Sequence, residues 1–92
     1  MSDVRILLNI LYDHIKCLEA AIKEVEIARR TLNNNYSDLG STWKDKKYEE
    51  LGIVVKECTD ILMRTQKKFL QAQQSLAMMM KALQNYEETN ID

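Results

Sequence analysis

The sequence has no proline and only two glycines, Gly40 and Gly52, among its 92 residues. Because proline removes a backbone donor and clashes with the preceding helical turn, its absence lets helices run without interruption. An excess of one charge is also missing, since 13 Lys and Arg stand against 14 Asp and Glu and the formal net charge is −1. This balance gives no field that would attract nucleic acid or an anionic membrane surface, so we expect neither as a partner.

Residues that carry chemistry are scarce. The single histidine, His14, cannot supply the two or more imidazoles of the common zinc sites. Cys17 lies three residues further on, but the second cysteine, Cys58, is far along the chain. The sequence also contains no glycine-rich phosphate loop and no HExxH motif. We therefore expect a protein that is not an enzyme, with no catalytic residue, no metal and no cofactor.

Two cysteines are too few for a disulfide framework. If the chain folds back near residues 40–43, position 17 lies opposite about position 66, which is roughly 12 Å of helix from Cys58 and beyond bridging distance. Both cysteines lie on apolar stripes, so we expect buried free thiols. The first residues, MSDVRILLNILYDH, do not resemble a signal peptide, and no apolar run approaches the roughly 20 residues of a membrane span. We expect a chain that is made in the cytoplasm and not inserted in a membrane, with export lacking a cleaved signal left open.

Apolar residues recur at helical spacing through the first half of the chain. Steps of four and three give the row Val4, Leu8, Leu11, Ile15, Leu18, Ile22, Val25, Arg29, Leu32, Tyr36 and Leu39. Arg29 is the one charged member, and it can either pair across an interface or extend its head to water. A flanking row widens this stripe: Leu7, Ile10, His14, Cys17, Ala21 and Ala28. The pattern predicts one long amphipathic helix over about residues 3–38.

The second half repeats the pattern. Its row is Tyr48, Leu51, Val55, Cys58, Leu62, Thr65, Phe69, Ala72, Leu76, Met79, Leu83 and Tyr86. Thr65 is the polar exception, and Val54, Ile61 and Ala82 widen the stripe. We predict a second helix over about residues 43–87, a short frayed C-terminus, and one all-α domain spanning residues 1–92.

The segment NNNYSDLGST separates the two helices, and we expect the turn at about residues 39–42. Gly40 is placed to end the first helix in a left-handed conformation. Ser41 or Thr42 can then cap the second helix, with Asp45 in its first turn. Because the connection is short, the helices must run antiparallel. The fold expected is a two-helix antiparallel hairpin.

Each apolar stripe is wider than the single seam that a two-helix hairpin buries. Ile6, Leu7 and Ile10 near the start, and the Met78–Met80 run, need further cover. We therefore expect two hairpins to assemble into a four-helix bundle dimer. The side chains expected to form the core and the interface are Leu11, Leu18, Ile22, Leu62, Phe69 and Leu76.

A tryptophan stands at the turn, in the segment TWKDKKYEEL. A chain of about ninety residues with two long helices and this tryptophan resembles the WXG family of small helical proteins of type VII secretion. Trp43 and Lys44 match the start of the family's turn motif, Tyr48 occupies the position of its later aromatic residue, and Asp45 stands where the family usually has glycine. We take Trp43, Asp45 and Tyr48, with Gly40, as the turn motif, and expect the Trp43 ring to cover the open corner of the hairpin.

The resemblance implies a non-enzymatic interaction protein linked to type VII secretion. Its role would be that of an exported substrate, or of a helical partner or targeting factor for a larger effector. The partner would be a second copy of the chain or another helical chain, such as the N-terminal helical region of a secreted effector. The alternative is a cytoplasmic structural or adaptor coiled-coil protein that is not exported.

Overall fold

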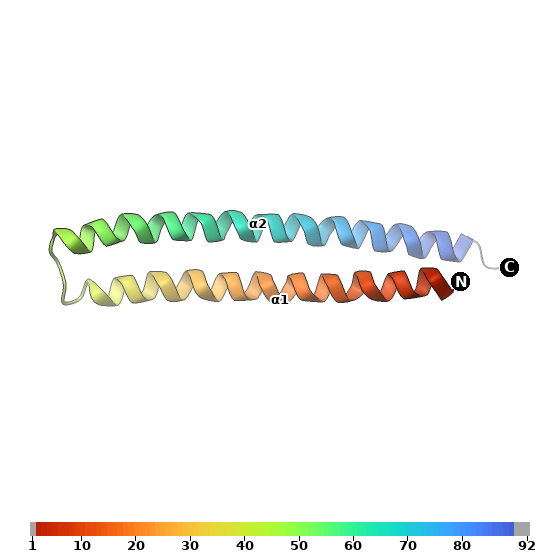
Figure 1. Ribbon diagram of the computed structural model, residues 1–92, viewed down its shortest axis with the longest axis horizontal. Helices are drawn as coiled ribbons and strands as arrows, with labels where there is room; N and C mark the ends of the chain where they lie inside the picture. Colours follow the sequence, from red (N-terminus) through yellow and green to blue (C-terminus); the bar gives the residue numbers. More distant parts are fainter. Residues whose placement is uncertain (1, 90–92) are drawn as a thin grey trace.

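Two long helices lie side by side and antiparallel in the computed structural model, which describes residues 2–89 (Figure 1). Helix α1 comprises Ser2–Leu39 and helix α2 comprises Lys46–Thr89, and the described residues contain no strand. The hairpin is a rod of 73 × 15 × 13 Å with the turn at one end and both termini at the other (Figure 1). The expected all-α antiparallel hairpin is confirmed, and the C-terminus expected to fray lies largely outside the described residues.

The turn is longer than expected, because α2 begins at Lys46 and not near residue 43. The carboxylate of Asp45 explains the difference. Its Oδ1 accepts hydrogen bonds from the backbone amides of Lys47 at 2.9 Å and Tyr48 at 3.2 Å, which is the geometry of an N-cap. Neither residue expected to cap α2 does so, and the Ser41 hydroxyl instead donates to the Asp38 carbonyl at 2.7 Å, at the end of α1.

Gly40 ends α1 without a left-handed backbone, since none of the described residues has a positive φ. The expectation of a left-handed cap is therefore wrong. The chain closes the helix through ordinary turn hydrogen bonds, from the Gly40 amide to the Tyr36 carbonyl at 3.2 Å and from the Trp43 amide to the Leu39 carbonyl at 2.9 Å. Glycine at this position instead leaves room for the Tyr48 ring of the second helix.

The apolar row predicted for the first helix faces α2 from Val4 to Tyr36, and only Leu39, which is 44% exposed, departs from it. Leu11 is the most buried member at 6% exposure. Arg29 is half-buried within this row, and its Nε has no hydrogen-bond partner among the described residues. The period of the sequence therefore predicted the inner face of α1 almost completely.

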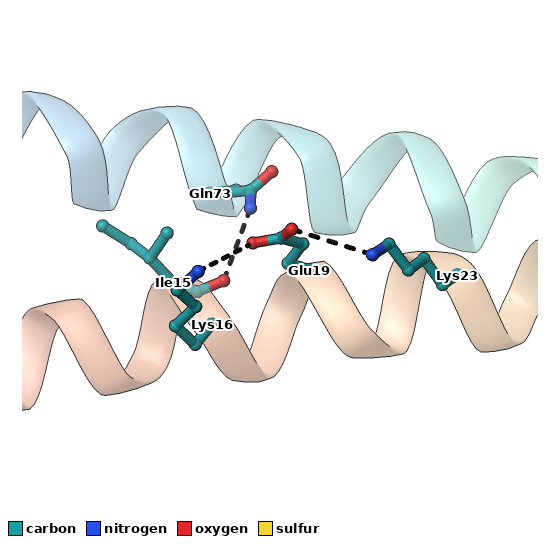
Figure 2. Close-up of polar contacts among 5 residues, drawn as sticks. All are labelled: Ile15, Lys16, Glu19, Lys23 and Gln73. Carbon is teal, nitrogen blue, oxygen red and sulfur yellow. Dashed lines mark hydrogen bonds and ion pairs between the residues drawn. The ribbon is translucent and has the colours of Figure 1, made fainter.

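Helix α2 is rotated relative to the prediction. Four residues that were expected in the seam are exposed, namely Cys58, Ala72, Met79 and Tyr86. The residue that follows each of them is buried or half-buried instead: Thr59, Gln73, Met80 and Glu87. The apolar stripe of α2 is wider than the surface α1 can cover, so periodicity alone does not select which part turns inward. Specific contacts select it. One is the Gln73 amide, which donates to the Ile15 carbonyl of α1 at 3.4 Å (Figure 2).

The core between the helices is thin. Leu11 and Val55 are the only buried apolar side chains, Thr59 is the one buried polar residue, and none of the large side chains is fully buried within the described part of the chain. Of the residues expected to form the core and interface, Leu11 is buried. The other five are half-buried: Leu18, Ile22, Leu62, Phe69 and Leu76. A single hairpin therefore removes only part of its apolar surface from water.

Candidate functional site

Two tyrosines join the helices next to the turn. The rings of Tyr36 on α1 and Tyr48 on α2 are parallel, with centroids 4.2 Å apart and an interplanar angle of 1°. The Tyr36 hydroxyl donates to the Tyr48 carbonyl at 3.0 Å, and the Tyr48 hydroxyl donates to the Tyr36 carbonyl at 2.8 Å. Burial and the neighbouring Tyr48 hydroxyl raise the pKa of Tyr36 above its ordinary value. We call this reciprocal arrangement the tyrosine clasp.

Each ring of the clasp lies against a glycine on the opposite side of the hairpin. A Cβ built on Gly40 would lie 2.6 Å from Cζ of Tyr48, and a Cβ on Gly52 would lie 2.9 Å from Cζ of Tyr36. These separations are shorter than carbon atoms tolerate, so a larger residue at either position must displace a ring. Both glycines of the chain therefore serve the same contact.

The sequence carries a signal for the clasp that its periodicity does not reveal. The segments YSDLG, residues 36–40, and YEELG, residues 48–52, share Tyr, Leu and Gly at the same spacing. Each segment provides one tyrosine, and its glycine accommodates the ring of the other. Apolar periodicity places Tyr36 in the seam and gives Gly52 no role. A search for short internal repeats would have identified both.

The turn motif residues expected from the sequence lie beside this clasp. The Trp43 ring contacts Tyr48 with centroids 6.2 Å apart and a tilt of 56°, and 37% of Trp43 stays exposed. The Trp43 side chain and the backbone amides of Tyr48 and Lys47 hold the pKa of the Asp45 carboxyl below its ordinary value, against the opposing effect of desolvation. The structure thus brings Gly40, Trp43, Asp45 and Tyr48 together at one end of the rod, and Trp43 covers this corner only in part.

A second feature of interest is one long side of the rod. In an antiparallel pair of right-handed helices, the rows that flank the seam on the same side can be assigned from the seven-residue repeat. On α1 this side consists of Asp3, Leu7, Ile10, His14, Cys17, Ala21, Glu24, Ala28, Thr31, Asn35 and Asp38. On α2 it consists of Lys47, Leu51, Val54, Cys58, Ile61, Thr65, Lys68, Ala72, Ser75, Met79, Ala82, Tyr86 and Thr89. We call these 24 positions the apolar face.

Charge separates the apolar face from the opposite side of the rod. Only five of its 24 positions are charged, against 13 of the 23 described positions that flank the seam on the other side. The opposite side carries the ion pairs of Glu19 with Lys16 at 3.8 Å and Lys23 at 3.9 Å (Figure 2), and of Glu26 with Arg30 at 2.9 Å. The two sides of the hairpin thus differ mainly in charge, because the opposite side also exposes large apolar side chains, namely Tyr12, Ile53, Met63 and Leu70.

The apolar face is exposed along its whole length, with only Ala21, Leu51 and Thr65 half-buried. An open hollow of about 530 Å³ indents it and the adjoining edge of α1. Its lining is Glu24, Ile27, Ala28, Thr31, Leu32 and Asn35. The face therefore has both the composition and the relief of a surface that a complementary helix can contact.

Both cysteines lie on the apolar face, and both are free and exposed, so the expectation of buried thiols is wrong for the single hairpin. The reason is the rotation of α2, which moves Cys58 out of the seam, and the flanking position of Cys17. His14 lies in the same flanking row as an exposed side chain.

Within residues 2–89, no cluster of three or more His, Cys, Asp or Glu side chains could hold a metal ion, and no helix is long and apolar enough to cross a membrane. Comparisons of the chain with family models, curated proteins and solved structures find no match. The candidate sites are therefore interpreted from their own geometry.

Proposed function

We propose that this chain is a non-enzymatic protein–protein interaction module that binds a second helical chain through its apolar face. The observation that carries the proposal is the contrast between this face and the charged side opposite. A water-exposed surface with so few charges along a rod of 73 Å is typical of an interface. A helical partner packed on it would complete a four-helix bundle.

The exposed area supports the same proposal. The hairpin exposes 7228 Å². A compact monomer of this mass exposes about 5,500 Å² by the usual scaling. The excess of roughly 1,700 Å² on one chain is about twice the area of about 800 Å² that each partner contributes to a stable protein–protein interface. The rod shape itself accounts for part of this excess, and a partner on the apolar face would remove another part of it from water.

Light scattering coupled to size exclusion tests the proposal with two matched variants. Ile61 lies on the apolar face and is 53% exposed, whereas Ile53 lies on the opposite side and is 63% exposed. We expect the unmodified protein to elute at twice the chain mass, Ile61→Glu at the mass of one chain, and Ile53→Glu at twice the chain mass. Both variants place a charge on an exposed position, so only the face differs.

A folded protein that stays at the mass of one chain at high micromolar concentration, and whose melting temperature does not depend on concentration, would exclude a second copy as the partner and leave only a different helical chain. If Ile53→Glu dissociates the dimer and Ile61→Glu does not, the interface lies on the side opposite the apolar face. Circular dichroism verifies that each variant keeps its helices.

The resemblance to the WXG family extends the proposal to type VII secretion, as an exported substrate or as a helical partner or targeting factor of a larger effector. Support comes from the turn, where the two aromatic residues that carry the resemblance are in contact, Trp43 with Tyr48. Asp45 takes the place of the usual glycine and has its own role as the cap of α2.

Export is tested by following the protein in culture medium from a strain with an active type VII system and from one whose secretion ATPase is inactivated. We expect the protein in the medium of the first strain only. Retention inside the cells of both strains would favour the alternative, a structural or adaptor coiled-coil protein without export.

A further inference from the structure

The charges on the apolar face point to one occupant and one orientation. We infer that the face binds a second copy of this chain, with both turns at the same end, so that α1 of each hairpin packs against α2 of the other. This inference rests on the proposed interaction function and adds the identity and the direction of the partner.

The register of the two helices follows from three contacts. The Gln73 amide lies at the Ile15 carbonyl, Gly52 lies against the Tyr36 ring, and Gly40 lies against the Tyr48 ring. In each pair the residue numbers add to 88, so residue 24 of α1 is level with residue 64 of α2. Positions on different helices can therefore be compared along the length of the rod at 1.5 Å per residue.

Charges on the apolar face are segregated by helix. On α1 they are all acidic, namely Asp3, Glu24 and Asp38, and on α2 they are all basic, namely Lys47 and Lys68. Neither Glu24 nor Lys68 forms an ion pair with another described residue. By the register above, Glu24 and Lys68 lie about 6 Å apart in height, and Asp38 and Lys47 about 4.5 Å.

This segregation distinguishes the two ways in which the face can pack on a copy of itself. With both turns at the same end, α1 meets α2 of the second copy at the same height, so Glu24 lies near Lys68 and Asp38 near Lys47, each pair twice by symmetry. Asp3 is level with residue 85 and has no basic counterpart on the face. With the turns at opposite ends, α1 meets α1 and α2 meets α2. The acidic row would then face an acidic row, which electrostatic complementarity disfavours.

The hollow on α1 fits the same arrangement. It spans the heights of residues 24–35, which are level with residues 53–64 of α2. Val54 and Ile61 are the exposed apolar side chains of the face within that range. In the inferred dimer these side chains of the second copy lie over the hollow and fill it.

Charge reversal tests the pairing. We expect Glu24→Lys and Lys68→Glu each to raise the dissociation constant about tenfold or more, because each places like charges opposite one another. The double variant should return to within about threefold of the unmodified protein, because the pair is restored with its signs exchanged. Lys67→Glu changes the net charge as Lys68→Glu does but lies on the opposite side, and it should leave the dissociation constant unchanged.

Disulfide formation tests the orientation independently. Residue 28 is level with residue 60, beside Cys58. In a Cys17→Ser background, Ala28→Cys should therefore cross-link to Cys58 of the second copy on oxidation. Ala20→Cys, on the outer edge of α1, should not. Ala21→Cys lies near the middle of α1 on the apolar face. In a chain without Cys17 and Cys58 it should form no disulfide-linked dimer on oxidation, because the two α1 helices lie at diagonally opposite corners of the inferred bundle.

The outcomes separate the inference from the proposed function. Suppose that Ile61→Glu dissociates the dimer. If the double charge reversal then fails to restore binding, or if Ala21→Cys does form a cross-link, the inferred orientation is wrong and the interaction function stands. A monomer at all concentrations overturns the second copy as the partner, whereas the proposed interaction with a different helical chain stands. Rescue together with the Ala28→Cys cross-link supports the inferred dimer.

Discussion

At the scale of single residues, the turn end is held by the tyrosine clasp. Two tyrosines exchange hydrogen bonds at 3.0 and 2.8 Å, and each glycine leaves room for one ring. Considered one at a time, Gly40 is a residue that ends α1, and Gly52 is a residue of low helix propensity inside α2. Their common purpose depends on a contact between residues 12 positions apart in the chain.

Gly52→Ala provides a test of the clasp, because two effects of opposite sign compete. Alanine is about 1 kcal/mol better than glycine inside a helix. Its Cβ, however, would lie 2.9 Å from Cζ of Tyr36 and must displace the ring. We expect Gly52→Ala to lower the free energy of unfolding in the unmodified chain and to raise it by about 1 kcal/mol in a Tyr36→Ala background. Urea denaturation at one protein concentration measures both.

Gly40→Ala serves as the companion experiment, since Gly40 lies outside the helices and gains little from helix propensity. It should destabilise the chain with Tyr48 present and have little effect in a Tyr48→Ala background. An increase of stability on Gly52→Ala in the unmodified chain would show that the Tyr36 ring is not held where the structure places it.

Asp45 gives a prediction for pH. Because the Trp43 side chain and two backbone amides hold the pKa of its carboxyl below the ordinary value, the ionised form stabilises the folded state. That stability is present above about pH 4, the unfolded value, and is lost as the pH falls through the folded pKa. We expect Asp45→Ala to lower the melting temperature near neutral pH. Asp45→Asn keeps a capping side chain, and its melting temperature should approach that of the unmodified protein below about pH 4. A difference in melting temperature between the two that is constant over the whole pH range would contradict this.

At the scale of elements, the two helices differ in how well their inner faces follow from the sequence. On α1 the predicted row turns inward almost completely, although a flanking row widens its stripe. On α2 the predicted row turns inward only in part, and the clasp and the Gln73–Ile15 hydrogen bond hold the helix in its observed rotation. The consequence is that Cys58, Ile61 and Met79 face outward and become part of the apolar face.

A pair of leucines in α1 tests the seam. Leu11 is 6% exposed, and Leu39, which fits the same seven-residue repeat, is 44% exposed. We expect Leu11→Ala to lower the free energy of unfolding by about 2–4 kcal/mol, whereas Leu39→Ala should cost less than about 1 kcal/mol. Equal losses in urea denaturation would indicate that the seam extends to the end of α1.

At the scale of the whole molecule, the hairpin is a rod with a thin core and one side that carries few charges. Two buried apolar residues are a small core for the part of the chain that the structure describes, residues 2–89. A core this small usually needs a staple or a partner for stability. The apolar face provides the place for a partner, and the ion pairs on the other side keep that side solvated.

The two free cysteines report on the whole assembly, because both are exposed in a single hairpin and lie on the apolar face. We expect a thiol reagent to label them quickly at low protein concentration and at least about tenfold more slowly once the dimer forms, since the partner covers them. Ile61→Glu should keep labelling fast at every concentration. Identical rates for the unmodified protein and this variant at high concentration would show that the face stays open.

The sequence by itself determined the helices, their antiparallel order and the inner face of α1, because these depend on local periodicity and on a short connection. Tertiary structure decided the rotation of α2, the start of α2 after Asp45, and the pairing of two tyrosines with two glycines. These features depend on contacts between residues that are distant in the chain or on a competition between several possible caps, which a seven-residue repeat does not encode. The apolar face follows from that rotation, since it is the part of two wide stripes that a single seam cannot cover.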